Sequence, residues 1–152
     1  MSISYTVTRQ TVAPHLLAAA RASVRRDAIS KTVLALIGKS WSFIREHSLQ
    51  NDGINVAVYR GDRGLVLVEA GARVLAPFDG VGDVRCVATP SGDAAVATHM
   101  GEYELLGGAH SAITAWCKSN GHALEGTNWE VYGHWSDDPR TRRTDVYYLL
   151  AP

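Results

Sequence analysis

The chain has 152 residues, of which 46% are hydrophobic and 20% are charged, and its formal net charge is zero. This composition is typical of one globular domain with a single core. The balanced charge argues against a protein whose main task is electrostatic capture of DNA or anionic lipid, so we expect neither direct nucleic-acid binding nor a membrane partner. The basic residues at 25–26 and 140–143 are expected to lie in solvated turns, because no aromatic residues are interleaved with them.

Neither cysteine, Cys86 or Cys117, lies in a CxxC or metal-ligand spacing, and the six histidines show no HxH or HxxxH pattern. We therefore expect no metal and no cofactor. The N-terminus lacks the features of a secretion signal, and no apolar run approaches the roughly 18 residues of a membrane span. A cytoplasmic protein with two reduced thiols is expected.

The first half of the chain is predicted to hold strands around one helix. Alternating apolar residues indicate strands over 3–7, 54–58 and 65–69, and 16–24 is assigned as a strand because a better helix follows it. Val33, Leu34, Ile37, Trp41 and Ile44 fall at helical spacing and predict an amphipathic helix over 30–48. Residues 77–83 are the best linker candidate, since they contain two glycines.

The second half repeats this order. Strands are predicted over 84–88, 94–99, 129–134 and 145–150, with turns at 89–93 and 137–139. Leu106, Ala109, Ile113, Trp116 and Cys117 share one face of a helix. Each half therefore has the order strand, strand, helix, strand, strand, which predicts an α+β fold of two modules, approximately 1–76 and 84–152, within one domain spanning 1–152.

Several short motifs carry a resemblance to a known family. They are Thr89-Pro90-Ser91-Gly92, His99-Met100-Gly101-Glu102-Tyr103, Trp116, Gly121, Trp129-Glu130-Val131-Tyr132 and Asp145-Val146-Tyr147-Tyr148. With these motifs the chain resembles the GyrI-like, or bacterial transcription-regulator effector-binding, domain family, specifically over 84–150 and more loosely over 1–83. The resemblance implies two pseudo-symmetric βαββ modules, with helices on one sheet face and a ligand cleft between the modules on the other face. It also implies ligands that are lipophilic and often cationic or aromatic.

The sequence departs from this family at two points. Glu102 stands where members often have proline before the motif tyrosine. A chain of 152 residues leaves no room for the DNA-binding domain that many members carry, which argues against direct transcriptional regulation. The resemblance also extends to stand-alone members that are similar to hydrolases of strained, cyclopropane-bearing compounds.

Glu130 is the leading candidate for a binding residue, because it lies in a strand that otherwise reads as buried and aromatic. A carboxylate there needs a compensating partner, and a cationic ligand could be that partner. Strand alternation places Glu130 with Tyr132 on one face, and Trp129 with Val131 on the other. We expect the apolar pair to cover the helix and Glu130 and Tyr132 to line the cleft.

The same argument applies to the first half, where Asn55, Ala57 and Tyr59 are expected to line the cleft. If the repeat is real, Tyr59 matches Tyr132 and Ala57 matches Glu130, so the predicted site has two tyrosines and one carboxylate. Such a site suits a flat cation. Two alternatives stay open: Glu130 as a solvated edge-strand residue, and the tyrosines as half-buried strand aromatics.

Three functions follow as hypotheses. The first is a stand-alone module that senses or sequesters a lipophilic, cationic or aromatic small molecule. The second is a hydrolase of strained or electrophilic xenobiotics, in which Glu130 activates water. The third is an inhibitor of a macromolecular partner, for which the neutral charge gives no support.

Overall fold

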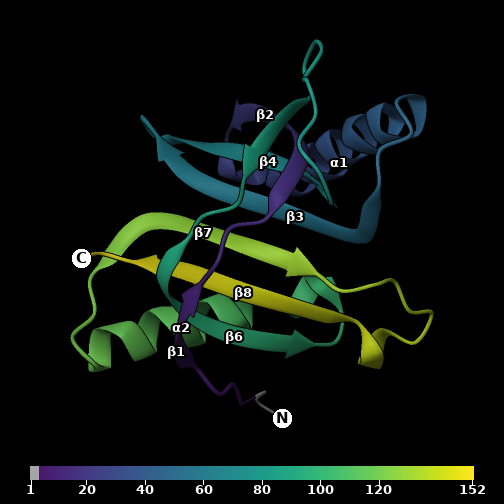
Figure 1. Cartoon of the computed structure of the whole chain (residues 1–152). Helices are drawn as coiled ribbons and strands as arrows, with labels where there is room; N and C mark the ends of the chain where they lie inside the picture. The colour runs from purple at the N-terminus through teal and green to yellow at the C-terminus, as the bar shows by residue number, and fades with distance from the viewer. Residues whose placement is uncertain (1–3) are drawn as a thin grey trace. The chain divides into compact units, whose positions relative to one another are not determined.

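The computed structural model describes residues 4–152 and confirms the α+β fold class. Its strands are β1 (Thr8–Val12), β2 (Leu16–Val24), β3 (Asn51–Asp62), β4 (Leu65–Val74), β5 (Arg85–Ala88), β6 (Gly92–Met100), β7 (Leu124–Tyr132) and β8 (Arg143–Leu150). Its α-helices are α1 (Ile29–Glu46) and α2 (Gly107–Ser119), and short 3-10 turns lie at Arg26–Ala28, Tyr103–Leu105 and Pro139–Thr141. The predicted order of two strands, one helix and two strands occurs twice along the chain (Figure 1).

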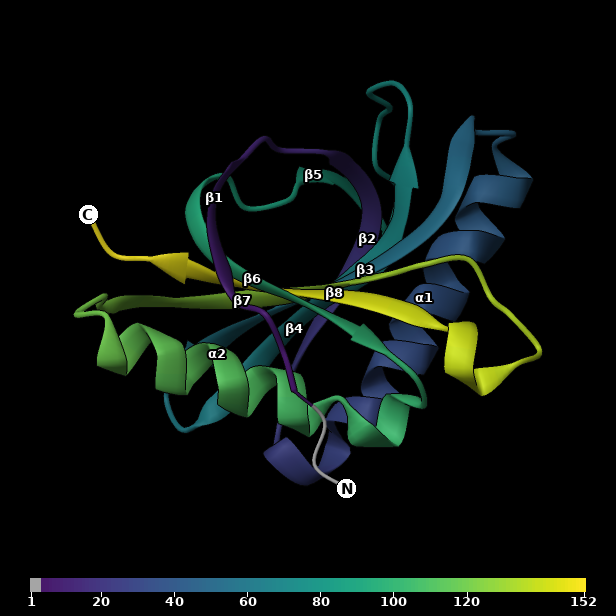
Figure 2. The same ribbon diagram turned by 90° about the horizontal axis from the view of Figure 1, so that it is seen from below.

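Backbone contacts divide the chain into two compact units. Unit 1 comprises residues up to 13 together with 90–152, and unit 2 comprises 14–89. In unit 1 the strands follow the order β1-β6-β8-β7, and every neighbouring pair is antiparallel. Helix α2 lies along one face of this sheet (Figure 2). Burial of apolar side chains between helix and sheet stabilises the unit, and the buried cluster consists of Ala95, Ala97, Leu106, Ala109, Ile113, Cys117, Val146 and Leu150.

Unit 2 is built in the same manner, with antiparallel strands in the order β3-β4-β2-β5 and helix α1 against one face. Gly71 on β4 is packed between Ala18 of the neighbouring strand β2 and Ser40 of α1. A Cβ atom at this position would lie 1.8 Å from the carbonyl oxygen of Ala18 and 2.7 Å from Oγ of Ser40. Only glycine therefore fits here, and Ser40 itself donates hydrogen bonds to the carbonyl oxygens of Leu36 and Ala70.

The first strand of each half pairs outside its own half, so the contact units differ from the expected modules 1–76 and 84–152. Strand β1 pairs with β6, whereas β5 pairs with β2. Both three-residue connectors, 13–15 and 89–91, contain a proline, Pro14 and Pro90, which favours extended backbone over a hairpin turn. Thr89 and His15 also exchange two hydrogen bonds of 2.7 and 2.8 Å. The turn predicted at 89–93 is therefore corrected: residues 89–91 form an extended connector, and β6 begins at Gly92.

Two further local predictions are corrected. The strand expected over 3–7 lies partly outside the described residues, and β1 begins only at Thr8. Tyr5 and Val7 are instead half-buried against the α2 cluster, so their alternation reflects packing rather than strand pairing. In α1, Leu34 is 73% exposed, while Leu36, Ser40 and Phe43 are buried, so the buried stripe is rotated from the one expected.

The strand after each helix carries the same irregularity, which supports the internal repeat. In β3 the register shifts between Asn51 and Asn55, and in β7 it shifts between Leu124 and Asn128. A glycine with positive φ lies inside each shift, at Gly53 and Gly126, as a bulge requires. Aligning the two bulges matches Ala57 with Glu130 and Tyr59 with Tyr132, as the sequence predicts.

None of the helices in the described part of the chain is long and apolar enough to cross a membrane.

Candidate functional site

Glu130 points toward helix α2, contrary to the prediction that it faces away from the helix. Its carboxylate oxygen Oε2 lies 2.7 Å from Nε2 of His110, which is on α2. Trp129 and Val131 therefore lie on the opposite face of the sheet. Alternation along a strand assigns residues to two faces, but it does not say which face the helix covers. The prediction assumed that the apolar residues Trp129 and Val131 face the helix, and this assumption was wrong.

The carboxylate of Glu130 takes part in a chain of four side chains. Tyr132 donates its hydroxyl proton to Oε1 of Glu130 at 2.6 Å, and His110 contacts the hydroxyl of Tyr148 through Nδ1 at 2.7 Å. The side chain of Glu130 is only 9% exposed, whereas that of His110 is 24% exposed. The compensation that a nearly buried carboxylate requires thus comes from the protein itself, namely from His110 and Tyr132.

A second buried histidine occupies the same side of the sheet. His99 is fully buried, with Nε2 donating to the carbonyl oxygen of Glu102 at 2.9 Å and Nδ1 at 2.7 Å from the hydroxyl of Tyr5. Because the carbonyl can only accept, Nδ1 accepts from the tyrosine in the neutral ring. Burial raises the pKa of Tyr5, and its hydrogen bond to His99 anchors the N-terminal segment.

The predicted site residues of unit 2 also face their helix. Asn55 accepts a hydrogen bond of 2.7 Å from the indole nitrogen of Trp41 on α1. Alternation places Ala57 and Tyr59 on the same face, and both are buried. Their expected orientation away from the helix is therefore wrong. A ligand-binding role for Asn55, Ala57, Tyr59, Glu130 and Tyr132 stays a prediction.

The face of unit 1 opposite α2 carries a parallel aromatic pair. The rings of Trp129 and Tyr147 stack with centroids 5.0 Å apart and an interplanar angle of 5°. Val131 and Asp145 form the next cross-strand pair on this face. Trp129 is buried and Tyr147 is half-buried, so Tyr147 is the more accessible ring. We call these four residues the opposite face.

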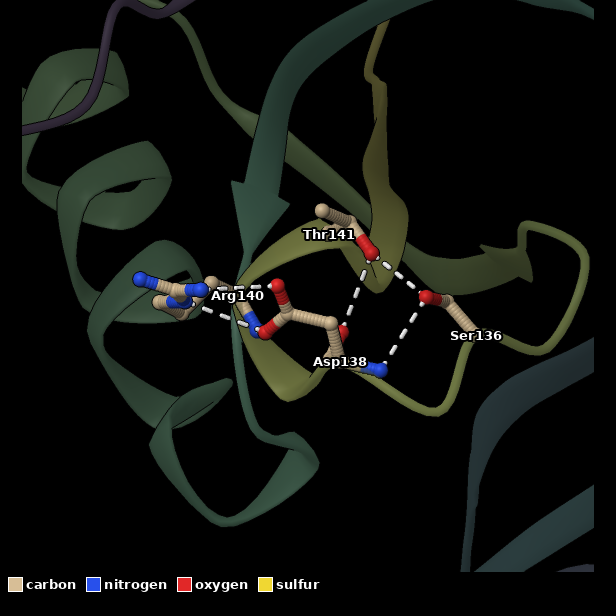
Figure 3. Close-up of polar contacts among 4 residues, drawn as sticks. All are labelled: Ser136, Asp138, Arg140 and Thr141. Atoms are coloured by element: carbon tan, nitrogen blue, oxygen red, sulfur yellow. Dashed lines mark hydrogen bonds and ion pairs between the residues drawn. The ribbon is translucent and has the colours of Figure 1, made fainter.

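Arginines at 140–143 are engaged in local contacts on or beside the loop between β7 and β8. Asp138 accepts hydrogen bonds from Nε and the terminal nitrogen of Arg140 at 3.1 and 3.0 Å, and the hydroxyls of Ser136 and Thr141 tie the loop together (Figure 3). The hydrogen bonds from Arg140 hold the pKa of Asp138 below its usual range.

The two remaining arginines of this cluster have partners of their own. The guanidinium of Arg142 lies 3.7 Å from the ring centroid of the exposed Trp135, and Arg143 bonds Asp145 through Nε at 3.0 Å. Each arginine of the cluster is thus engaged close to its own place in the chain. Arg140 and Arg142 belong to a structured loop, whereas Arg143 is the first residue of β8.

Two residues of this region were missed by the sequence reasoning. His110 lies one position after Ala109 on the predicted helix, and a histidine beside an apolar stripe is the signal that could have drawn attention to it. Tyr147 belongs to a predicted strand, but its stacking with Trp129 depends on the register between β7 and β8. Among residues 4–152, no group of three histidine, cysteine, aspartate or glutamate side chains is arranged to hold a metal ion.

No protein-family model matches the sequence, and comparison with curated proteins gives no significant match. Solved structures do match. The crystal structure of the EcmrR C-terminal domain has a TM-score of 0.79 at 17% identity, covering 98% of this chain and 99% of that chain. In the EcmrR–DNA complex, at 15% identity and the same TM-score, 96% of this chain corresponds to 57% of the EcmrR chain.

Two further solved structures match this chain, one described as bound to a small molecule and the other as a hydrolase. SAV2435 bound to tetraphenylphosphonium has a TM-score of 0.68 at 9% identity, covering 98% of this chain and 94% of that chain. A hydrolase from Listeria innocua has a TM-score of 0.60 at 10% identity, covering 95% and 91%. The chain therefore has the fold of a GyrI-like effector-binding domain, as its motifs predict.

Proposed function

We propose that the protein is a small-molecule-binding module that senses or sequesters a lipophilic, cationic or aromatic ligand. The observation that carries the proposal is the opposite face of unit 1, where the stacked Trp129 and Tyr147 lie beside Asp145. Stacked rings attract a flat or cationic ligand, and a neighbouring carboxylate favours positive charge. The fold shared with EcmrR and with tetraphenylphosphonium-bound SAV2435 supports the same class of ligand.

Asp145 is the acidic member of this face. Its side chain is 19% exposed and pairs with Arg143, whose side chain is 60% exposed. Because Arg143 is so exposed, its ion pair contributes only about 1 kcal/mol, and a cationic ligand can compete with it for Asp145, which keeps its 2.7 Å hydrogen bond from the Thr98 hydroxyl. For binding of a cation, this local carboxylate then matters more than the zero net charge of the whole protein.

Calorimetric titration with tetraphenylphosphonium, and with neutral triphenylphosphine oxide as the matched probe, tests the proposal. Replacing Tyr147→Leu should weaken binding of tetraphenylphosphonium about tenfold, since a desolvated cation–π contact contributes about 1–2 kcal/mol. Asp145→Asn should weaken binding of the cation more than that of the neutral oxide. The exposed Trp135→Leu variant is the control for loss of an aromatic ring. Undiminished binding in Tyr147→Leu and Asp145→Asn would refute the proposed face.

The predicted role of Glu130 is tested in the same titrations. If Glu130 is a direct counter-ion, Glu130→Gln should weaken binding of the cation more than binding of the neutral oxide. If Glu130 acts only through His110, Glu130→Gln should change the affinity for the cation and the affinity for the neutral oxide equally, or change neither.

A further inference from the structure

We propose that Tyr148, His110 and Glu130 form a nucleophile, base and orienting group that reacts with activated carboxylic esters on the helix-facing side of unit 1. The inference is independent of the proposed ligand face, which lies on the other side of the same sheet. It rests on the direction of the hydrogen bonds within the chain of side chains.

The carboxylate fixes the tautomer of the histidine. An ionised carboxylate offers only acceptors, so Nε2 of His110 must carry the proton in the 2.7 Å contact with Glu130. In the neutral ring, Nδ1 is then an acceptor, and the Tyr148 hydroxyl, 2.7 Å away, donates to it. A hydroxyl donating to an imidazole that a carboxylate orients is the arrangement that activates a nucleophile, whatever the order of the residues in the sequence.

The orienting group is itself held in place. Tyr132 donates to the second oxygen of Glu130 at 2.6 Å, so the carboxylate cannot rotate without losing this bond. Glu130 on β7 and Tyr148 on β8 contact the two nitrogens of the His110 imidazole and hold it from both sides. Tyr148 and His110 also meet edge to face, with ring centroids 5.5 Å apart and an interplanar angle of 76°.

The carboxylate end of this series of side chains is nearly buried, and the tyrosine end is partly exposed beside the α2 cluster. The exposed fraction of the side chain rises from 9% at Glu130 to 24% at His110, and Tyr148 is half-buried. Asn128 lies directly opposite Tyr148 in the register of β7 and β8, so it shares this face. Its side-chain amide offers an N–H donor for the oxygen of a reacting carbonyl.

The reaction proceeds in two balanced steps. The Tyr148 oxygen attacks the ester carbonyl as its proton passes to Nδ1 of His110, the bond from carbon to the leaving oxygen breaks, and the alcohol departs with that proton. The product is an acyl ester of Tyr148. Water then adds to this ester with His110 as base, which releases the carboxylic acid and restores the tyrosine hydroxyl.

The pair formed by Tyr5 and His99 provides a matched internal control. It has the same contact between tyrosine hydroxyl and Nδ1, at 2.7 Å. Its orienting group is the backbone carbonyl of Glu102 instead of a carboxylate, and the imidazole is fully buried. Tyr5 should therefore not react, and Tyr5→Phe should leave the reaction unchanged.

The test is release of p-nitrophenol from p-nitrophenyl acetate, with peptide mapping by mass spectrometry to locate any acetyl group. We expect release above background that Tyr148→Phe abolishes and His110→Gln lowers at least tenfold, and we expect any trapped acetyl on Tyr148 instead of the adjacent Tyr147. Thermal unfolding checks that each variant is folded.

Two outcomes would overturn the proposal. One is release that is equal in wild type and in a folded Tyr148→Phe variant. The other is acetylation that falls equally on Tyr147 and Tyr148 in the wild-type protein, a comparison that needs no variant.

Discussion

The contact between His110 and Glu130 should contribute measurably to stability, although the histidine side chain is 24% exposed. The perturbation is a double-mutant cycle of Glu130→Gln and His110→Ala at pH 7. Glu130→Gln removes the negative charge with little change of shape, and His110→Ala removes the partner on α2. The cycle isolates their interaction from the separate effects of each substitution.

The expected magnitude follows from burial. The contact is a hydrogen bond from an imidazole to a carboxylate, and exposed fractions of only 24% and 9% shield both side chains from much of the solvent. Hydrogen bonds to charged groups contribute about 1.5–3 kcal/mol. We therefore expect a coupling free energy of about 2 kcal/mol.

Urea denaturation measures this coupling. With an m-value of about 2 kcal/mol/M, a loss of 2 kcal/mol moves the midpoint by about 1 M. The control is the cycle of Arg9→Ala and Asp93→Ala on the same sheet, because that pair is as close, at 2.6 Å, but its side chains are 54% and 41% exposed. The control coupling should be smaller. A coupling below about 0.5 kcal/mol for His110 and Glu130 would refute the argument from burial.

Three further predictions concern other parts of the fold. Gly71→Ala should lower the free energy of unfolding by at least about 2 kcal/mol, because its Cβ would clash with backbone 1.8 Å away, and an unchanged melting temperature would contradict this. Burial raises the pKa of Asp52, but hydrogen bonds and the charge of Arg73 outweigh it and hold that pKa below its usual range. Wild type should therefore be more stable than Asp52→Asn above a pH of about 3.9, and this advantage should disappear as the pH falls through the lower pKa that Asp52 has in the folded protein. A difference in denaturation midpoint that does not depend on pH would disprove this. Cys86 should react with a thiol reagent before Cys117, whose pKa is raised by burial, and equal rates would count against it.

Much of the local structure was predictable because it depends on short-range pattern. The apolar spacing of 106–117 predicts α2, and turn residues mark the ends of most strands. The internal repeat was also visible, since Tyr59 and Tyr132 occupy matching places after matching bulges. The buried stripe of α1 was misjudged at Leu34, because spacing alone admits more than one face of a helix.

The candidate site was predicted in part. The sequence marks Glu130 as a carboxylate that requires a partner, and the structure supplies one. That partner, His110, is 20 residues away in the sequence and on a different element, so no local pattern connects the two. Likewise, Trp129 was recognised as a strand aromatic, but its stacking on Tyr147 depends on how β7 and β8 are paired.

The sequence by itself determined the α+β class, the order of the elements and the sets of residues that share a strand face, because helical and strand periodicities are properties of neighbouring residues. Only the tertiary structure decided which face each helix covers, and which strands pair with β1 and β5. Both depend on contacts between residues distant in sequence, whose burial is worth more than any local preference. The carboxylate of Glu130 therefore faces a histidine on α2, and the aromatic pair of Trp129 and Tyr147 lies on the other side of the sheet.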